Sequence, residues 1–475
     1  MIIPPVAAKK PVERVHHNDV YVDNYEWLRD KESPAVIAHL EAENAYTEAR
    51  TEHLTLLQEQ IFEEITDRTQ ETDLSVPVRR GQWWYYTRTV EGLEYGIHCR
   101  APVDGPDDWD PPVVSPSTAA TVHGQAEDAP ALPGEQVLLD DNAEAAGHDF
   151  YSLGSFDLSS DGGLLLYGVD TEGDERYTLR IRDIDHGRIH RPASIADDDT
   201  DAVDLSTNNL ADEIPGTAAG AMFDRSGRYV FYTTVDEAWR PDTVWRHEIG
   251  TPREADVSVF HEPDERFWVG VGRTRSRAYL VIEAGSSVTS ETRLLASDDP
   301  TGEFTVVWPR REGVEYDVEH AVIGGEDRLL IVHNHNAVNF ELVSVAAADP
   351  QGAALTMLPH NPAVRLESVD AFRDFVVVEY RSEGLTRVAI ARRDDKKKIG
   401  LTELKFGELL YSVGTMGNPE WEQPTIRLNY TSFVTPSTVY DVARTGSGRS
   451  RRARAAACAA GARRWPRPRR RPSTG

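Results

Sequence analysis

The stretch AMFDRSGRYVFYTTVDEAWRPDTVWRHEIG, residues 221–250, decides the fold. It holds two runs that mix β-branched and aromatic residues, Tyr229–Val235 and Thr243–Ile249. Residues of this kind favour strands, whereas Gly227 before the first run and Pro241 at the second favour turns. The stretch therefore predicts most of one four-stranded antiparallel unit.

Similar units recur along most of the chain. Their core strands are expected at Trp83–Arg88, Leu164–Val169, Tyr229–Val235, Ala278–Glu283, Arg328–His333, Phe375–Tyr380 and Thr425–Tyr430. The last five markers, Val230, Leu280, Leu330, Val377 and Leu428, follow one another at steps of 50, 50, 47 and 51 residues. Steps of this length are typical of β-propeller blades. Loop-like inserts at 101–134 and 196–220 explain the two longer steps before them. We predict a mainly β fold with a seven-bladed β-propeller; a two-domain β-sandwich is the structural alternative.

The N-terminal part follows a different pattern. Residues 1–32 are expected to be irregular, and Ser33-Pro34 then provides a helix start. Apolar residues recur with helical spacing up to about Arg68, which predicts one or two amphipathic helices. Their apolar stripe needs a partner, because such helices gain most of their stability from packing. The predicted domains are a helical segment over 1–75, the propeller over 76–442, and a tail over 443–475.

The tail is rich in Arg, Ala and Pro and contains almost no large apolar residue. Such a composition cannot bury enough surface to fold, so we expect disorder. Its basic charge could bind nucleic acid or the acidic body of the chain. The same composition is typical of GC-rich DNA translated out of frame, and we favour a frameshift.

Charge and composition limit the possible partners. The net charge is −28, and without the eleven Arg of 444–475 the remaining 40 basic and 79 acidic residues leave −39. So acidic a body repels nucleic acid and anionic membranes, and it could steer cationic ligands. With two Cys, no apolar N-terminal leader and no run long enough for a membrane span, a cytoplasmic location is expected.

Few residues in the chain suggest chemistry. Asp236 and Glu237 lie in the loop of residues 236–240 and are candidates for gating substrates at a channel mouth. An ion pair with Arg240 or Arg246 is the equally weighted alternative. His333 and His335 could share a strand face, with His320 as a distant third, but they are a weak zinc site. The aspartates among residues 197–204 lack the pattern of a calcium loop. No cofactor or metal is expected.

The sequence also lacks the motif that usually carries a nucleophilic serine. Serine hydrolases of α/β type place the nucleophile in a G-x-S-x-G turn beside an oxyanion hole. No such pentapeptide occurs in the sequence, and no catalytic residue is assigned.

Several stretches together resemble the prolyl oligopeptidase family, and within it the oligopeptidase B branch, which cleaves short peptides after Lys or Arg. The resemblance covers about residues 4–442. The stretches that carry it are Asn24–Asp30, His39–Asn44 with Tyr46-Thr47, Thr72–Pro77, Glu135–Asp140, Arg240-Pro241 through Arg246-His247, Thr289–Glu291, and Tyr430–Pro436 with Tyr440-Asp441.

The resemblance implies a propeller that covers the active site and filters substrates by size. It also implies a C-terminal α/β-hydrolase domain with a Ser, Asp and His triad, on which the N-terminal helices pack. The sequence leaves the family pattern near Ala443, so no triad residue is carried over, and we expect no peptidase activity from this chain alone. If a hydrolase domain were supplied, the partners would be short basic peptides; otherwise the uncovered helices could cause aggregation. A non-enzymatic binding or scaffold propeller and a propeller glycosidase are the alternatives.

Overall fold

The computed structural model describes residues 3–112, 132–184, 203–204, 208–392 and 400–443. They divide into two compact units, one up to Gln70 and the other from Glu71 onward. The predicted tail after 443 lies outside the described residues.

The first unit contains a hairpin and two helices. Its elements are β1 (Val12–His16), β2 (Asp19–Asp23), the 3-10 turn η1 (Glu26–Arg29), α1 (Pro34–Thr51), the 3-10 turn η2 (Glu52–Leu54) and α2 (Thr55–Thr66). The helix begins at Pro34 as predicted, with Ser33 at the N-cap, although the Ser33 hydroxyl makes no capping hydrogen bond. None of the helices in the described residues is long and apolar enough to cross a lipid bilayer.

The expectation of an irregular N-terminus is wrong for residues 12–23. Two valine-containing runs pair there as an antiparallel hairpin, with Val12 opposite Asp23 and His16 opposite Asp19. The two turn residues His17 and Asn18 have φ angles of 48° and 66°. A two-residue hairpin turn of this kind needs positive φ at both positions, and Asn adopts it more readily than most residues.

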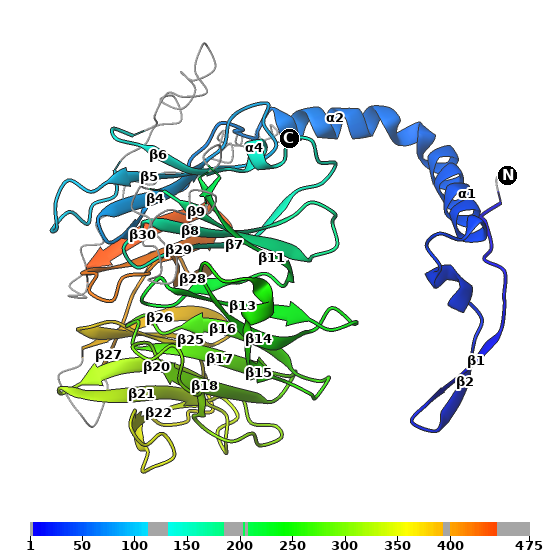
Figure 1. Cartoon of the computed structure of the whole chain (residues 1–475). Coiled ribbons are helices and arrows are strands. Elements are labelled where there is room, and N and C mark those ends of the chain that lie inside the picture. Colours follow the sequence, from blue (N-terminus) through cyan, green and yellow to red (C-terminus); the bar gives the residue numbers. More distant parts are fainter. Residues whose placement is uncertain (1–2, 113–131, 185–202, 205–207, 393–399, 444–475) are drawn as a thin grey trace, which may run out of the picture. The chain divides into compact units, whose positions relative to one another are not determined.

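The second unit is a seven-bladed propeller of antiparallel sheets, with successive blades formed by successive parts of the chain (Figure 1). Blade 1 is β3 (Val78–Arg80), β4 (Trp83–Arg88), β5 (Ile97–Pro102) and β6 (Gln136–Asp140), followed by the short helix α4 (Asp141–Glu144). Blade 2 is β7 (Ser152–Leu158), β8 (Leu164–Asp170), β9 (Tyr177–Asp183), β11 (Asn209–Thr217) and β10 (Val203–Asp204), in spatial order. Blade 3 is β12 (Met222–Phe223), β13 (Tyr229–Val235), β14 (Pro241–Glu248) and β15 (Val257–His261), with the 3-10 turn η5 (Arg253–Ala255) before β15.

The remaining blades repeat this order. Blade 4 is β16 (Trp268–Arg273), β17 (Tyr279–Gly285), β18 (Ser290–Ala296) and β19 (Thr305–Val306). Blade 5 is β20 (Tyr316–Ile323), β21 (Glu326–His333), β22 (Glu341–Ala346) and β23 (Leu355–Leu358). Blade 6 is β24 (Val364–Ala371), β25 (Phe375–Ser382), β26 (Leu385–Arg392) and β27 (Leu401–Glu403), and blade 7 is β28 (Tyr411–Thr415), β29 (Thr425–Ser432) and β30 (Thr438–Ala443).

The seven predicted core strands are the second strands of the seven blades. A second strand is paired on both edges and packed on both faces, so its sequence is almost continuously apolar. In β8 all seven residues are buried. The prediction of a loop-like insert is wrong for 209–217, where β11 joins blade 2. Its buried face includes Asp212, and a polar residue at that inward position weakens the apolar alternation in the sequence.

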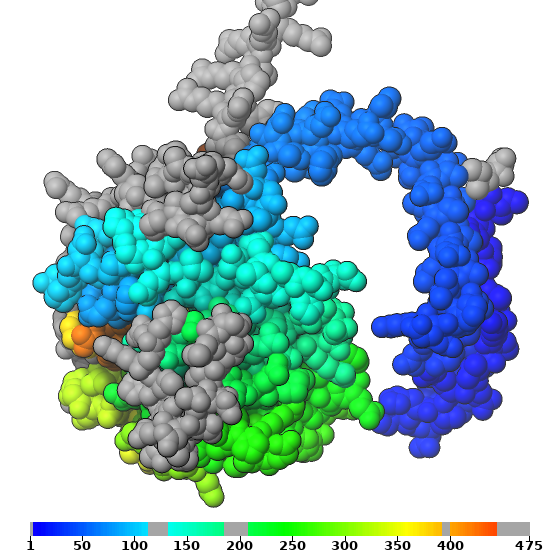
Figure 2. Space-filling view, turned by 45° about the horizontal axis from the view of Figure 1, so that its top comes forward, coloured from blue at the N-terminus to red at the C-terminus, as the bar shows by residue number. Residues whose placement is uncertain are grey.

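The core lies between the blades. Phe231 of blade 3 packs with Ile282 of blade 4, and Leu330 of blade 5 packs with Val378 of blade 6. Clusters of this kind join each blade to the next from blade 1 to blade 7. The space-filling view shows the blue, cyan and green blades in close contact (Figure 2).

The seam between blades 7 and 1 is different, because polar contacts form it. Arg427 on β29 donates to the carbonyl of Pro77 at 2.7 Å and pairs with Asp441 at 2.9 Å. Glu420 accepts from the amide of Gly81 at 2.9 Å. None of the apolar clusters found in the described residues contains both blade 7 and blade 1 residues. The ring is therefore closed by side chains at this seam, without a shared strand.

Candidate functional site

The propeller presents two ends with different connections. The connections between the first and second strand of each blade lie at one end, which we call the hairpin end; they are tight turns in blades 1 to 6 and a longer connection in blade 7. The loops between second and third strands, and the connections from blade to blade, lie at the other end, which we call the loop end. Asp236 and Glu237 follow β13 and therefore belong to the loop end.

Asp236 makes the ion pair that was the structural alternative. Its carboxylate accepts from the amides of Ala238 at 2.8 Å and Arg240 at 3.1 Å, and pairs with Arg240 Nε at 2.9 Å. Burial raises the pKa of this carboxyl, but the hydrogen bonds from Arg240 outweigh that effect and lower it. Asp236 therefore shapes its own loop. Glu237 is exposed, and its role at the mouth stays a prediction.

Arg240 extends this contact to the next blade. Its Nη1 donates to the carbonyls of Glu262, Asp264 and Phe267 at 3.2, 3.2 and 2.9 Å, in the connection between β15 and β16. The pairing predicted with Arg246 is not made, because that guanidinium group donates to the carbonyl of Pro300 at 3.1 Å.

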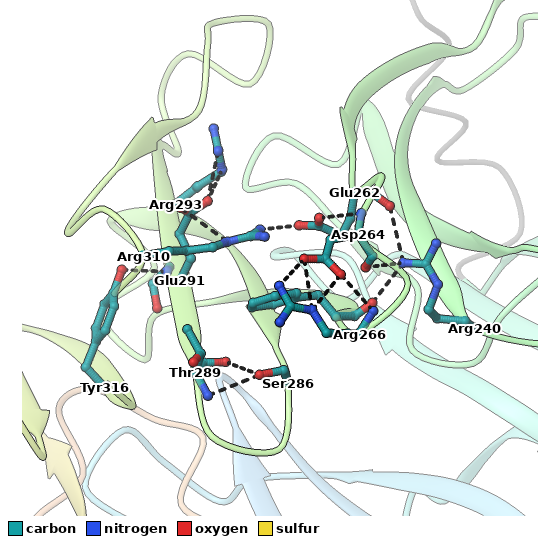
Figure 3. A network of polar contacts seen from close by, with 12 residues as sticks. Arg240, Glu262, Asp264, Arg266, Ser286, Thr289, Glu291, Arg293, Arg310 and Tyr316 are labelled. Carbon is teal, nitrogen blue, oxygen red and sulfur yellow. Dashed lines mark hydrogen bonds and ion pairs between the residues drawn. The ribbon is translucent and has the colours of Figure 1, made fainter. Parts of the chain in front are cut away.

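Charged residues of blades 3 to 5 continue the network along the loop end (Figure 3). Arg310 pairs with the buried carboxylate of Glu262 and lies 3.5 Å from Glu291. Burial raises the pKa of Glu262, but the hydrogen bond from Arg310 outweighs that effect, and the net result is a lowered pKa. The pair is therefore ionised at neutral pH. Arg293 binds Glu291 at 2.8 Å, and Asp264 binds Arg266 at 2.7 Å.

The charged side chains of this network hold the loop end in shape and are poor candidates for catalysis. Its carboxylates pair with arginines, and the lowered pKa values of Glu262 and Asp264 make these two groups poor general bases. The hydrogen bonds to Arg266 lower the pKa of Asp264 to about 2. The geometry therefore supports a charged rim along the loop end, held together by ion pairs that link blades 3 to 5.

The histidines do not form the site considered from sequence. Strand β21 ends at His333, which faces Glu341 at 3.6 Å, and His335 in the following turn accepts from Arg311 at 3.0 Å. His320 contacts Ser276 at 2.8 Å, at the hairpin end. Within the residues that the structure describes, no three His, Cys, Asp or Glu side chains gather closely enough to hold a metal. The aspartates of 197–201 lie outside those residues.

A second charged cluster at the hairpin end was missed from sequence. Arg273 of blade 4 binds Asp157 of blade 2 at 2.5 and 2.9 Å, and Arg80 of blade 1 binds the same carboxylate at 3.3 Å. Arg275 of blade 4 binds Asp370 of blade 6 at 2.6 Å. The contacts of Arg273 and Arg275 join blades that are not neighbours in the ring. Arg275 lies in a turn that recurs among the blades, whereas Arg80 and Arg273 end the strands β3 and β16, and the sequence does not show where these side chains point.

A closed ring of seven antiparallel sheets with charged ends defines a β-propeller domain, a class in which ligands meet the ends of a central channel. Residues 4–451 match the family model described as the N-terminal β-propeller domain of prolyl oligopeptidase. The chain belongs to the prolyl oligopeptidase family.

Several relatives share both sequence and structure with this chain. It is 34% identical over 445 residues to dipeptidyl aminopeptidase BI of Pseudoxanthomonas mexicana and 30% identical over 438 residues to protease 2 of Moraxella lacunata, covering 92% of this chain and 56% of each relative. Oligopeptidase B from Trypanosoma brucei, in a closed form with covalently bound antipain, matches with a TM-score of 0.77, 30% identity, and 92% and 58% coverage of the two chains. The chain thus spans little more than half the length of these proteins, and it corresponds to their propeller part.

Proposed function

We propose that this chain provides the substrate-gating propeller of a serine peptidase that cleaves short peptides after Lys or Arg. The observation that carries the proposal is the match of the whole ring to oligopeptidase B at 30% identity. The strongly negative charge of the body supports a basic substrate, because it would steer cationic peptides toward the protein. The charged rim at the loop end, held together by ion pairs, supports a passage of fixed size.

We further propose that a hydrolase domain docks on the loop end of blade 7. Two connections meet there, since Thr435 donates to Glu408. Four large apolar residues of these connections are exposed: Leu409, Leu410, Phe433 and Val434. Exposed apolar patches of this kind are typical of interaction sites. In the N-terminal unit, Leu57, Ile61 and Ile65 form an exposed row on α2 that also suits an apolar partner.

The first experiment measures hydrolysis of a short Arg-containing amide by the purified chain. We expect no turnover, because a propeller supplies neither an activated serine nor an oxyanion hole. Turnover that persists after rigorous removal of host peptidases would contradict this part of the proposal.

The second experiment adds the chain to a separately produced oligopeptidase B hydrolase domain. We expect the chain to suppress cleavage of an unfolded protein while sparing a short Arg peptide, since the ring admits only short chains. A Phe433→Asp variant should lose this effect, and Phe150→Asp, at an exposed position on the connection between blades 1 and 2, is the matched control. Equal suppression of both substrates, or none by the unmodified chain, would count against gating.

Two further parts of the proposal concern the cell. The chain is proposed to be cytoplasmic, which is supported by its single described cysteine, Cys99, being buried and unpaired. Without a partner, the row on α2 is proposed to cause self-association. An Ile61→Glu variant should then stay monodisperse at concentrations where the unmodified chain aggregates, as light scattering would show.

A further inference from the structure

The hairpin end contains a turn in blade 4 that lacks the glycine found at the fourth position of its counterparts in blades 2 and 3. The turns Ser159–Gly162 in blade 2, Asp224–Gly227 in blade 3 and Thr274–Arg277 in blade 4 close in the same way. In each, the amide of the fourth residue donates to the carbonyl of the first, at 2.9, 3.3 and 2.8 Å. The fourth residue has a φ of 75°, 72° and 56°, respectively. Blades 2 and 3 place glycine at this left-handed position, whereas blade 4 places Arg277.

Arginine is an unfavourable choice at such a position. Its Cβ approaches the following carbonyl oxygen when φ is positive, a strain that glycine avoids. Strained residues of this kind cluster at functional sites. The inference from a strained residue to a function requires further evidence, and the surroundings of the Arg277 side chain provide it.

Most of the charged groups that act on Arg277 come from other blades. It interacts electrostatically with Arg80 of blade 1, Asp157 of blade 2 and Glu420 of blade 7, as well as with Arg273 of its own blade. Arg273 and Arg80 meet at Asp157 at the hairpin end, so the Arg277 side chain lies near a charged cluster to which blades 1, 2 and 4 contribute. Burial and the neighbouring guanidinium groups lower the pKa of Arg277, which indicates an environment short of negative charge.

The other charges of the cluster are already paired. Asp157 accepts from both Arg273 and Arg80 and from the amide of Phe223 at 3.0 Å. Glu420 accepts from the amide of Gly81. Three guanidinium groups and two carboxylates leave one positive charge uncompensated. Within the described residues, the Arg277 side chain takes part in none of the hydrogen bonds or ion pairs found.

We infer that Arg277, supported by Arg80 and Arg273, binds a peptide carboxylate at the hairpin end of the propeller. A guanidinium group offers two parallel donors that match a carboxylate, and a partly buried site strengthens the pairing. Arg273 and Arg80, held by Asp157, position the site and supply its field. The choice of a peptide as the source rests on the proposed function, whereas the carboxylate chemistry rests on the cluster alone.

The test measures binding and not cleavage, so it can fail independently of the proposed peptidase role. Three fluorescent tetrapeptides of alanine are titrated into the purified chain at low salt: one with a free C-terminal carboxylate, one with a C-terminal amide, and one with the amide and an internal Glu. We expect the first to bind at least tenfold more tightly than the second. Tight binding of the third as well would assign the site to carboxylates in general, and weak binding would assign it to the C-terminus.

The decisive variant is Arg277→Gly, because glycine occupies the same position in blades 2 and 3. Its melting temperature should equal or exceed that of the unmodified chain, while the preference for the carboxylate peptide disappears. Arg225→Gln, in the corresponding turn of blade 3, removes the same charge at an exposed position and should keep the preference. Arg277→Gln is the second variant in case the first perturbs the turn.

Three results would overturn the inference. They are equal affinity of the unmodified chain for the acid and amide peptides, an undiminished preference in both Arg277 variants, and an equal loss of preference in Arg225→Gln.

Discussion

The seam between blades 7 and 1 should be especially sensitive to the loss of one guanidinium group. Arg427 is 7% exposed and Asp441 is 13% exposed, so their ion pair is largely withdrawn from water. The Arg427 side chain also donates to the carbonyl of Pro77, across the seam. In Arg427→Met, the methionine side chain takes the place of the apolar part of the arginine. The Asp441 carboxylate and the Pro77 carbonyl, however, both lose their hydrogen-bond donor.

The expected loss is about 3–5 kcal/mol of unfolding free energy, the usual cost of leaving one partner of a buried ion pair uncompensated. Urea unfolding followed by tryptophan fluorescence measures it. The double variant Arg427→Met/Asp441→Leu should recover most of the loss, because no uncompensated buried charge remains. Hydrogen exchange should show that the loss is concentrated in β3 and β29.

The matched control is Arg228→Met, which breaks the pair with Glu248 within one blade. Arg228 is 54% exposed, and exposed pairs contribute little because water and salt screen them. Its unfolding midpoint should hardly move. If Arg427→Met loses less than about 1 kcal/mol, or no more than the control, the seam does not depend on this ion pair and the reasoning is refuted.

Three other predictions concern stability. Burial lowers the pKa of His247, but its two aspartate partners outweigh that effect and raise it. The stability that His247 contributes is therefore full below its ordinary pKa of about 6.5 and is lost as pH rises through the pKa of the folded state. In His247→Gln, the urea midpoint should fall less between pH 5.5 and 8.5 than it does in the unmodified chain. Burial raises the pKa of Glu319 to about 7, so Glu319 favours the fold at acidic pH and loses that contribution as pH rises through about 7. The stability of Glu319→Gln relative to the unmodified chain, measured by urea unfolding, should therefore increase between pH 6 and pH 8. Phe231→Ala should cost about 3–5 kcal/mol because Phe231 is fully buried between blades 3 and 4, whereas Phe433→Ala, at 93% exposure, should leave the midpoint unchanged.

The fold could be predicted because the strongest signals come from the second strands. Tyr229–Val235 is packed on both faces, and its apolar run marks blade 3 without any other information. The hairpin at 12–23 was missed because its strands lie largely exposed and carry charged residues among the valines. Strand β11 was missed because Asp212, an inward residue, is polar, and its carboxylate is satisfied by His247 at 2.9 Å.

The charged ends could be predicted only in part. The contact between Asp236 and Arg240 spans four residues in one loop, and such local pairs are visible in a sequence. The contact between Arg273 and Asp157 spans 116 residues and joins blades that are not neighbours, so no local pattern encodes it. The two residues come together only because the blades close into a ring, which brings parts of the chain that are distant in sequence close in space.

The polar seam also makes the propeller a candidate for circular permutation. Six junctions rest on apolar packing between blades that follow one another in the chain, whereas the seventh joins the two residues that flank β3 to Arg427 and Glu420 of blade 7. An engineered peptide linker across this junction would convert the ring into a covalently closed one. New chain ends could then be opened at any of the other junctions, and comparing such permutants would measure how much each blade contact contributes on its own.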